Sequence, residues 1–285
     1  MTDIAGGARH RPGRSLAFHI ALCIASIVML YPLLWMLASS FKPESEIFGN
    51  ASLFPSSFSL DAYRRGWAGL QVSFGRFFLN SLIVSLASVI GNVLSCSLAA
   101  YAVARLDFRF RAFWYALMLG TLMLPYHVTL IPQYILFLNL EWIDTFLPLV
   151  VPKFLAVDAF FIFLLVQFFR TIPRELDDAA KIDGCGPFRI YWRIILPLSL
   201  PALATAAIFT FIFTWDDFFG PLVYLNDIHS YTVQLGLRSF VDSTGKSDWG
   251  ALFAMSVLTL LPVLGFFVFF QRLLIQGIST TGLKG

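Results

Sequence analysis

The residue types that perform hydrolysis or bind metals occur in this sequence, but they lack the spacing that such chemistry requires. Gly245-Lys246-Ser247 looks like the end of a phosphate-binding loop, yet the glycine needed five residues earlier is Phe240. No Gly-x-Ser-x-Gly elbow for a serine nucleophile is present. Four histidines and three cysteines fall at positions without metal-ligand spacing: His10, His19, His127, His229, Cys23, Cys96 and Cys185. We therefore expect neither a catalytic site nor a metal site in this chain.

Charged residues are instead concentrated in one stretch, from Thr171 to Pro201. Nine of the 24 residues from Arg170 to Arg193 are charged. Each Lys, Arg or Asp at the centre of a membrane-spanning helix costs roughly 2.5 to 3.5 kcal/mol on insertion scales. This stretch must therefore lie in water, where its charges can face another molecule.

The local signals within the stretch predict two short helices joined by a glycine turn. Pro173 suits a first helical position, and three acidic residues follow in the first turns, where the helix dipole favours them: Glu175, Asp177 and Asp178. Gly184 is expected to end the first helix and Pro187 to begin the second. In the second helix, four apolar residues at helical spacing share a face that we expect to pack inward: Phe188, Tyr191, Trp192 and Ile195.

The composition indicates what surrounds this stretch. The chain of 285 residues is 58% hydrophobic and only 13% charged, and its mean hydropathy is +0.76, whereas about a quarter of the residues of a soluble domain are charged. The protein is therefore an integral membrane protein. Its net charge of +3 is small and its basic residues form no stripe, which argues against a nucleic-acid partner.

Six apolar segments are long enough to cross about 30 Å of hydrocarbon. They lie at about 15–37, 80–104, 112–139, 145–169, 201–225 and 250–271. The first is longer than the apolar part of a signal peptide, which favours an uncleaved span. We therefore predict an all-α membrane protein with three parts: an amino-terminal segment 1–15, a six-helix domain 16–271 containing the charged loop 170–200, and a tail 272–285.

The distribution of Lys and Arg predicts the orientation of these spans. With the amino terminus inside, the inner segments 1–15, 105–111, 170–200 and 272–285 hold 13 Lys and Arg. The outer segments 42–79, 140–144 and 226–249 hold 6 within the same total length. We therefore place both termini and the charged loop in the cytoplasm.

The charged loop also carries a specific motif. Asp178-Ala179-Ala180 is followed at fixed spacing by Gly184, Ile194 and Leu196-Pro197. This order resembles the EAA motif of ABC importer permeases, with Asp178 in place of the usual Glu. The resemblance implies that the loop, together with Glu175, is a coupling helix that fits a groove on an ATP-hydrolysing subunit and transmits its closure to the membrane helices.

The resemblance extends over nearly the whole chain and is to carbohydrate-uptake permeases similar to the maltose and glycerol-3-phosphate permease subunits. It rests on matches spread along the sequence: Phe41-Lys42-Pro43, Asn80-Ser81, Leu124-Pro125, Ile131-Pro132, Phe161-Ile162-Phe163 and the ending 276–285. It implies a type I importer fold in a bacterial inner membrane. The implied partners are a second, different permease, two ATPase subunits that bind ATP and Mg, and an extracytoplasmic solute-binding protein.

Polar residues within the apolar segments indicate a candidate translocation path, because such residues face a pathway or another protein. The candidates are Gln133, Asp158, Trp215 and Asp216. Asp216 and Asp217 are adjacent, so at most one can face a central path, and both could instead be solvated at the outer mouth. Lys153 precedes Asp158 by five residues, which is too far round a helix for a direct pair, so we expect it to extend outward.

Two other classes of protein make different demands on the sequence. In a self-sufficient ion-coupled carrier or channel, Asp158 and Asp216 would be ion sites, and the flux would not depend on a nucleotide. An intramembrane enzyme would need a nucleophile and base, and no such arrangement is found in the sequence.

Overall fold

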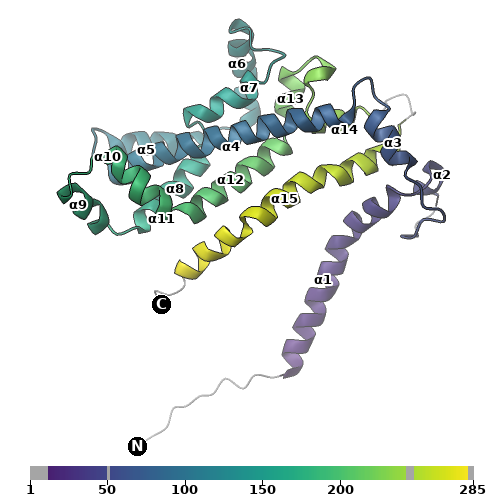
Figure 1. Cartoon of the computed structure of the whole chain (residues 1–285), viewed down its shortest axis with the longest axis horizontal. Coiled ribbons are helices and arrows are strands. Elements are labelled where there is room, and N and C mark those ends of the chain that lie inside the picture. The colour runs from purple at the N-terminus through teal and green to yellow at the C-terminus, as the bar shows by residue number, and fades with distance from the viewer. Residues whose placement is uncertain (1–11, 50–51, 242–246, 282–285) are drawn as a thin grey trace, which may run out of the picture.

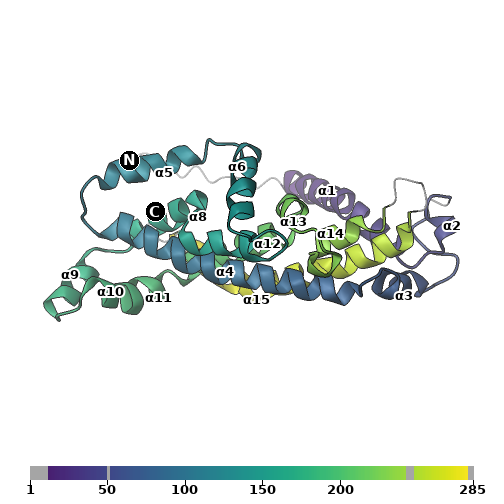
Figure 2. The same cartoon turned by 90° about the horizontal axis from the view of Figure 1, so that it is seen from above.

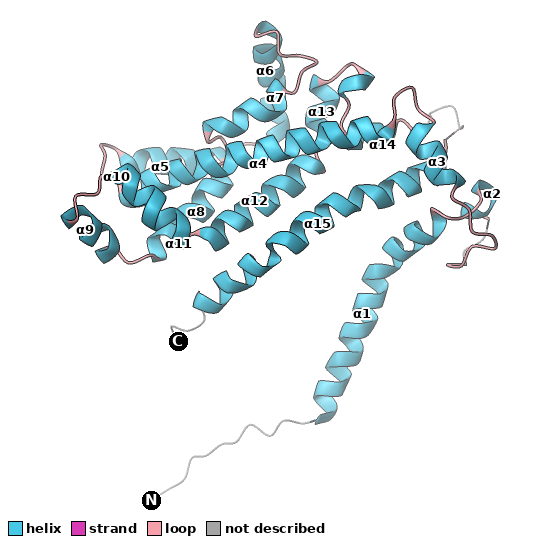
Figure 3. Ribbon diagram, viewed as in Figure 1, coloured by secondary structure: helices cyan, strands magenta, loops and turns pink. Residues whose placement is uncertain are grey.

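Every regular element in the described part of the computed structural model, residues 12–49, 52–241 and 247–281, is a helix (Figures 1 and 3). In chain order they are α1 (Pro12–Ser39), α2 (Glu44–Ile47), α3 (Asp61–Ala68), α4 (Phe74–Arg105), α5 (Arg111–Thr121), α6 (Tyr126–Asn139), α7 (Leu147–Val150), the 3₁₀-helix η1 (Val151–Leu155), α8 (Ala159–Thr171), α9 (Glu175–Ile182), α10 (Pro187–Ile190), the π-helix η2 (Tyr191–Ile195), α11 (Leu196–Leu198), α12 (Leu200–Trp215), α13 (Phe219–Tyr224), the 3₁₀-helix η3 (Ile228–Ser230), α14 (Val233–Arg238) and α15 (Trp249–Thr281). The predicted all-α class is confirmed. Parts of the predicted segments 1–15 and 272–285, and Gly245-Lys246, lie outside the described residues.

Helix α4 is the central helix, against which α8, α12, α14 and η1 pack. The side chain of Ser73 caps its first turn by accepting a hydrogen bond from the Gly75 amide. The buried face of α4 carries small and polar residues at helical spacing: Ser81, Ser85, Ser88 and Asn92. Small residues let helices approach closely in a membrane, and α8 and α12 both pack against α4. The Asn92 amide donates to the Thr210 hydroxyl of α12 at 2.7 Å.

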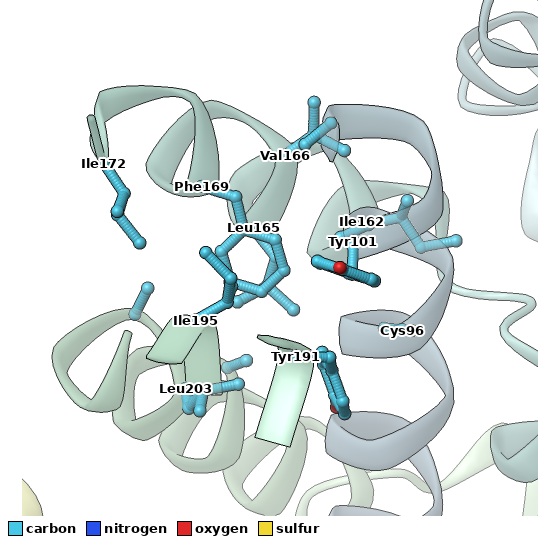
Figure 4. Packing of buried hydrophobic residues seen from close by; sticks show 14 of the residues in the cluster. Cys96, Tyr101, Ile162, Leu165, Val166, Phe169, Ile172, Tyr191, Ile195 and Leu203 are labelled. Atoms are coloured by element: carbon cyan, nitrogen blue, oxygen red, sulfur yellow. The ribbon is translucent and has the colours of Figure 1, made fainter. Parts of the chain in front are cut away.

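Two apolar clusters lie toward opposite ends of α4. The first joins the carboxyl-terminal half of α4 to α8 and to the 190–195 stretch, around Leu165, Phe169 and Tyr191 (Figure 4). The second joins the start of α4 to α3, the end of α12, and α15, around Phe77 and Trp215. The charged 170–200 loop is thus built onto the first cluster.

Three predicted spans are interrupted in the structure. The 112–139 segment breaks between α5 and α6, where Pro125 precedes the first residue of α6. The 145–169 segment passes through α7 and η1 before α8 begins at Ala159. The 201–225 segment ends its helix at Trp215 and resumes only at α13. Proline and adjacent carboxylates oppose a continuous helix, and averaged hydropathy does not detect them.

The number of spans follows from these breaks. Among the described residues, four helical stretches are long and apolar enough to cross a bilayer: Phe18–Ser39, Phe74–Arg105, Leu147–Thr171 and Trp249–Leu273. The pair Pro187–Leu198 and Leu200–Trp215, bent by 79°, makes five if it is counted as one span. The predicted count of six stays a prediction.

Helix α1 stands apart from the other helices (Figure 1). From Phe18 to Leu34 every residue of this helix is exposed, and burial within the chain begins only near its carboxyl-terminal end. Its outer end packs on α15, where the rings of Trp35 and Phe253 lie 5.3 Å apart. The rest of its apolar surface is therefore available to lipid or to another subunit.

The predicted inner and outer loops lie at opposite ends of the molecule. Helices α9, α10 and α11 are at one end and α2, α3 and α14 at the other in both views (Figures 1 and 2). At the outer end, Arg65 donates to Asp248 at 2.9 Å and to Glu44 at 3.1 Å. Burial and the charge of Asp248 raise the pKa of Glu44. Burial also opposes ionisation of Asp248, but hydrogen bonds from Arg65 and Ala251 outweigh it and lower the Asp248 pKa.

Candidate functional site

The charged loop folds as two helices separated by a turn at Gly184, as predicted. Gly184 has φ +77°, in the left-handed region that favours glycine. The Gly184 amide donates to Lys181 O and the Cys185 amide to Ala180 O, the two bonds of a Schellman motif that closes α9. Helix α9 begins at Glu175, two residues later than the position of Pro173 suggested.

The motif residues fall on two faces of this loop. Ala180 is buried in the first cluster, and Ile194 and Leu196 are half-buried against it. The remaining motif residues are exposed: Glu175, Asp178, Ala179, Gly184 and Pro197. Asp178 accepts from Lys181 at 2.9 Å, and this pair is exposed on both sides. The loop therefore presents a charged outer face while its inner face fixes it to the membrane helices.

The predicted inward face of the second helix is wrong in part. Tyr191 and Ile195 are fully buried, but Phe188 is 67% and Trp192 43% exposed. The residues from Tyr191 to Ile195 form a π-helix, whose wider turn shifts the register on which the i, i+3, i+4 rule depends. Ile190 takes up the buried position instead.

Apolar side chains are exposed on the outer face of the loop. Ile182, the last residue of α9, is 88% exposed, and Leu176 is 41% exposed. Phe188 of α10 is 67% exposed as well. Exposed apolar groups with a polar rim mark a surface that binds another protein.

The loop is tied to the membrane helices by a buried ion pair that the sequence did not reveal. Arg105, at the end of α4, donates to Asp177 of α9 at 3.2 Å, and the two side chains are 2% and 9% exposed. Arg105 also donates to the Phe169 and Ile172 carbonyls, each at 2.6 Å. Asp177 lies three residues before the buried Ala180, and that spacing was the one available signal of its burial.

The expectation for Lys153 is wrong. Its ammonium lies 2.9 Å from the Asp158 carboxylate. The two are not on one continuous helix: η1 ends at Leu155, and Ala156 has φ +53°. The left-handed backbone of Ala156 turns the chain back, so that the side chains of Lys153 and Asp158 meet although they are five residues apart. Asp158 directly precedes α8, at the break between η1 and that helix, within the apolar stretch Leu147–Thr171.

The other path candidates each contact a different segment. Gln133 accepts from the Tyr224 hydroxyl at 3.4 Å, and exposed Asp216 accepts from Gln234 at 3.3 Å. Trp215 is 1% exposed, and its indole donates to the Thr259 carbonyl of α15 at 3.1 Å. The structure therefore packs Trp215 inside the second cluster.

Asp217, the neighbour of Asp216, lines a small cavity whose wall is partly polar and partly apolar. The cavity has a volume of about 80 Å³, and its lining includes Ser81, Lys153, Thr214, Asp217 and Thr232. A space of this size holds only a few water molecules. Of the two adjacent carboxylates, Asp217 is thus the one that lines this cavity together with Lys153.

Comparison with known proteins gives concordant results. Residues 91–280 match the family described as binding-protein-dependent transport system inner membrane component. The chain is 34% identical over 271 residues to the arabinooligosaccharides transport system permease protein AraQ of Halalkalibacterium halodurans, covering 93% of this chain and 95% of that protein. It is 32% identical over 278 residues to the sn-glycerol-3-phosphate transport system permease protein UgpE of Brucella abortus, covering 95% and 98%.

Two further comparisons extend this likeness. The probable ABC transporter permease protein YurM of Bacillus subtilis is 33% identical over 266 residues, covering 93% of this chain and 87% of that protein. A chain in the crystal structure of a bacterial ABC transporter involved in the import of the acidic polysaccharide alginate superposes with a TM-score of 0.81. The match covers 95% of this chain and 99% of that one, at 21% identity. The fold is therefore shared.

Proposed function

This chain belongs to the family of binding-protein-dependent transport system inner membrane components, and we propose that it moves a sugar or sugar-like solute inward through a bacterial cytoplasmic membrane. It is a permease subunit of an ABC importer, a membrane protein distinct from the ATPase subunit. The proposed solute class rests on relatives that are named for arabinooligosaccharides, diacetylchitobiose and glycerol-3-phosphate.

The 175–197 loop is proposed to dock on the ATPase subunits. The observation that carries this proposal is the outer face of α9, where Ile182 and Leu176 are exposed beside the Asp178–Lys181 pair. The loop is also anchored on its inner face by Ala180 and Asp177, so a force applied to it reaches the helices. ATP and Mg would be bound by two partner ATPase subunits.

Transport would then proceed by alternating access. Closure of the ATPase pair would shift the loop and tip the helices from inward-facing to outward-facing, and an external solute-binding protein would release its cargo into the path. A nucleotide shifts such an equilibrium only by how much better it binds one state than the other. Gln133, Asp158 and Asp216 stay candidates for the path, and Asp217 joins them because it lines a cavity together with Lys153.

The membrane topology is part of the proposal. Six spans with both termini inside would require the α5–α6 pair to cross as a broken span in addition to the five stretches described above. The division into 1–15, 16–271 and 272–285 goes with this topology. The bare apolar surface of α1 supports contact with a second, different permease subunit.

The docking proposal is tested by substitution of an exposed residue that has no role inside the chain. We expect Ile182→Asp to abolish co-purification of the ATPase from the native membrane, because a carboxylate replaces the apolar group at the contact. Phe54→Asp is the matched control, since Phe54 is 84% exposed in the predicted outer loop. Retention of the ATPase by Ile182→Asp, or its loss with Phe54→Asp, would contradict the proposal.

The rival class, an ion-coupled carrier, is not favoured by the comparisons, since the relatives are ABC permeases. It makes an opposite prediction: uptake driven by an ion gradient without ATP. Uptake assays in vesicles with and without internal ATP separate the two.

A further inference from the structure

Helix α4 holds the charged loop with three polar side chains spaced four residues apart. Ser97 shares a hydrogen bond with the Tyr191 hydroxyl at 2.7 Å. Tyr101 donates to the Pro187 carbonyl at 2.9 Å, and Arg105 donates to Asp177 at 3.2 Å. Residues at this spacing lie along one face of a helix, so one edge of α4 follows the loop from η2 to α9.

Arg105 is the residue of this row that joins three helices. Its guanidinium binds the Asp177 carboxylate of α9 and the Phe169 and Ile172 carbonyls at the end of α8. A cation is favoured at that helix terminus, where carbonyls lack partners. Within the described residues, no other ion pair connects α9 to another helix.

Stability alone does not explain the buried Arg105–Asp177 pair. A buried ion pair must overcome its desolvation cost, and it is most favourable when every polar atom is satisfied. Here Arg105 Nε and Asp177 Oδ1 have no hydrogen-bond partner. The loop is already fixed by apolar burial of Ala180, Ile190 and Tyr191. The ion pair instead fixes the orientation of α9 relative to α4, because a charge-assisted hydrogen bond is directional whereas apolar contacts are not.

We propose that Arg105 is the positioning residue that transfers displacement of α9 to α4 and α8. Ser97 and Tyr101 extend the same connection along α4 toward the 187–191 stretch. The proposal rests on the proposed function, in which a partner ATPase moves the loop. It identifies α4, the central helix, as the element that receives this movement through polar contacts.

The test separates docking from transfer. Asp177→Asn removes the charge but keeps the shape, and it leaves Arg105 bound to the end of α8. In the complete importer in vesicles, we expect this variant to retain its ATPase subunits and to hydrolyse ATP. Solute taken up per ATP should fall at least about fivefold, the lower end of typical coupling between sites.

Three companion variants complete the test. Asp177→Glu keeps the charge and should restore most of the uptake per ATP, whereas Tyr101→Phe removes one hydroxyl and should lower it by a smaller factor. Asp107→Asn is the control, because Asp107 forms an exposed ion pair with Arg111 near the same end of α4, and it should behave as wild type.

Each outcome of these measurements supports or overturns the proposed role of Arg105. Wild-type uptake per ATP in Asp177→Asn would overturn the proposal, and so would loss of the ATPase subunits, which would make the pair a docking element. If Asp177→Asn does not reach the membrane, Tyr101→Phe decides: reduced uptake per ATP supports the proposal and unchanged uptake overturns it. A wild-type chain that binds no ATPase would contradict the proposed function itself.

Discussion

At both ends of this molecule short helices are held against long ones, but the contacts that hold them differ. At the predicted inner end, α9 is tied to α4 by the buried Arg105–Asp177 pair. At the predicted outer end, the ion pairs of Arg65 with Glu44 and Asp248 are partly exposed, and the elements pack closely at Gly66 against Met255 and at Gly236 against Phe77. The first end is therefore held by a buried, oriented polar contact, and the second by close packing.

The comparison predicts its largest effect at the inner end. Arg105→Ala should destabilise the subunit by about 3 to 5 kcal/mol, because Asp177 would be left buried without a partner. The measurement is the thermal unfolding of the purified complex, followed by protease protection of the 170–200 loop. Asp107→Ala, which breaks the Asp107–Arg111 pair at its 87% exposed member, should leave both readouts nearly unchanged. Equal effects of the two variants would remove the distinction between buried and exposed pairs.

An intermediate effect is predicted at the outer end. A Cβ on Gly236 would lie 2.3 Å from the Phe77 ring, and Phe77 is fully buried, so the ring cannot move away. Gly236→Ala should therefore cost about 1 to 3 kcal/mol, the usual penalty of overpacking. Gly265→Ala is the control, because a Cβ there would meet nothing within 4 Å. A stable Gly236→Ala complex would show that the outer packing yields more easily than the structure indicates.

The smallest effect is predicted for the exposed charges. Arg65→Gln should cost at most about 1 kcal/mol, since surface ion pairs contribute little. This loss of stability should shrink as the pH falls. Without Arg65 the Glu44 and Asp248 carboxylates repel each other. Because burial and the Asp248 charge raise the pKa of Glu44, Glu44 is protonated first and that repulsion ends. Unfolding midpoints measured from neutral to acidic pH test this, and a loss that grew toward acid would contradict it.

The sequence predicts this architecture well where the signal is local. Hydropathy located α1, α4 and α15, and Gly184 and Pro187 marked the turn between α9 and α10 because their backbone preferences act within a few residues. The motif spacing located the loop itself. These features depend on neighbours in the chain.

The features that the sequence did not predict depend on contacts between distant residues or on local departures from regular helix. Arg105 and Asp177 are 72 positions apart, and pairing them requires α4 and α9 to be placed first. The Lys153–Asp158 pair depends on the left-handed backbone of Ala156, an unusual conformation for alanine. The π-helix from Tyr191 to Ile195 likewise changed which aromatic rings are buried.

The isolation of α1 has a consequence for how the subunit is made. Lipid tails are as apolar as leucine, so a bare α1 surface carries no hydrophobic cost while it faces the bilayer. A copy synthesised before its partners can therefore wait in the membrane with this helix unpaired, without the aggregation that an equal apolar surface would cause in water. The order in which the subunits of the importer are produced is thereby left free.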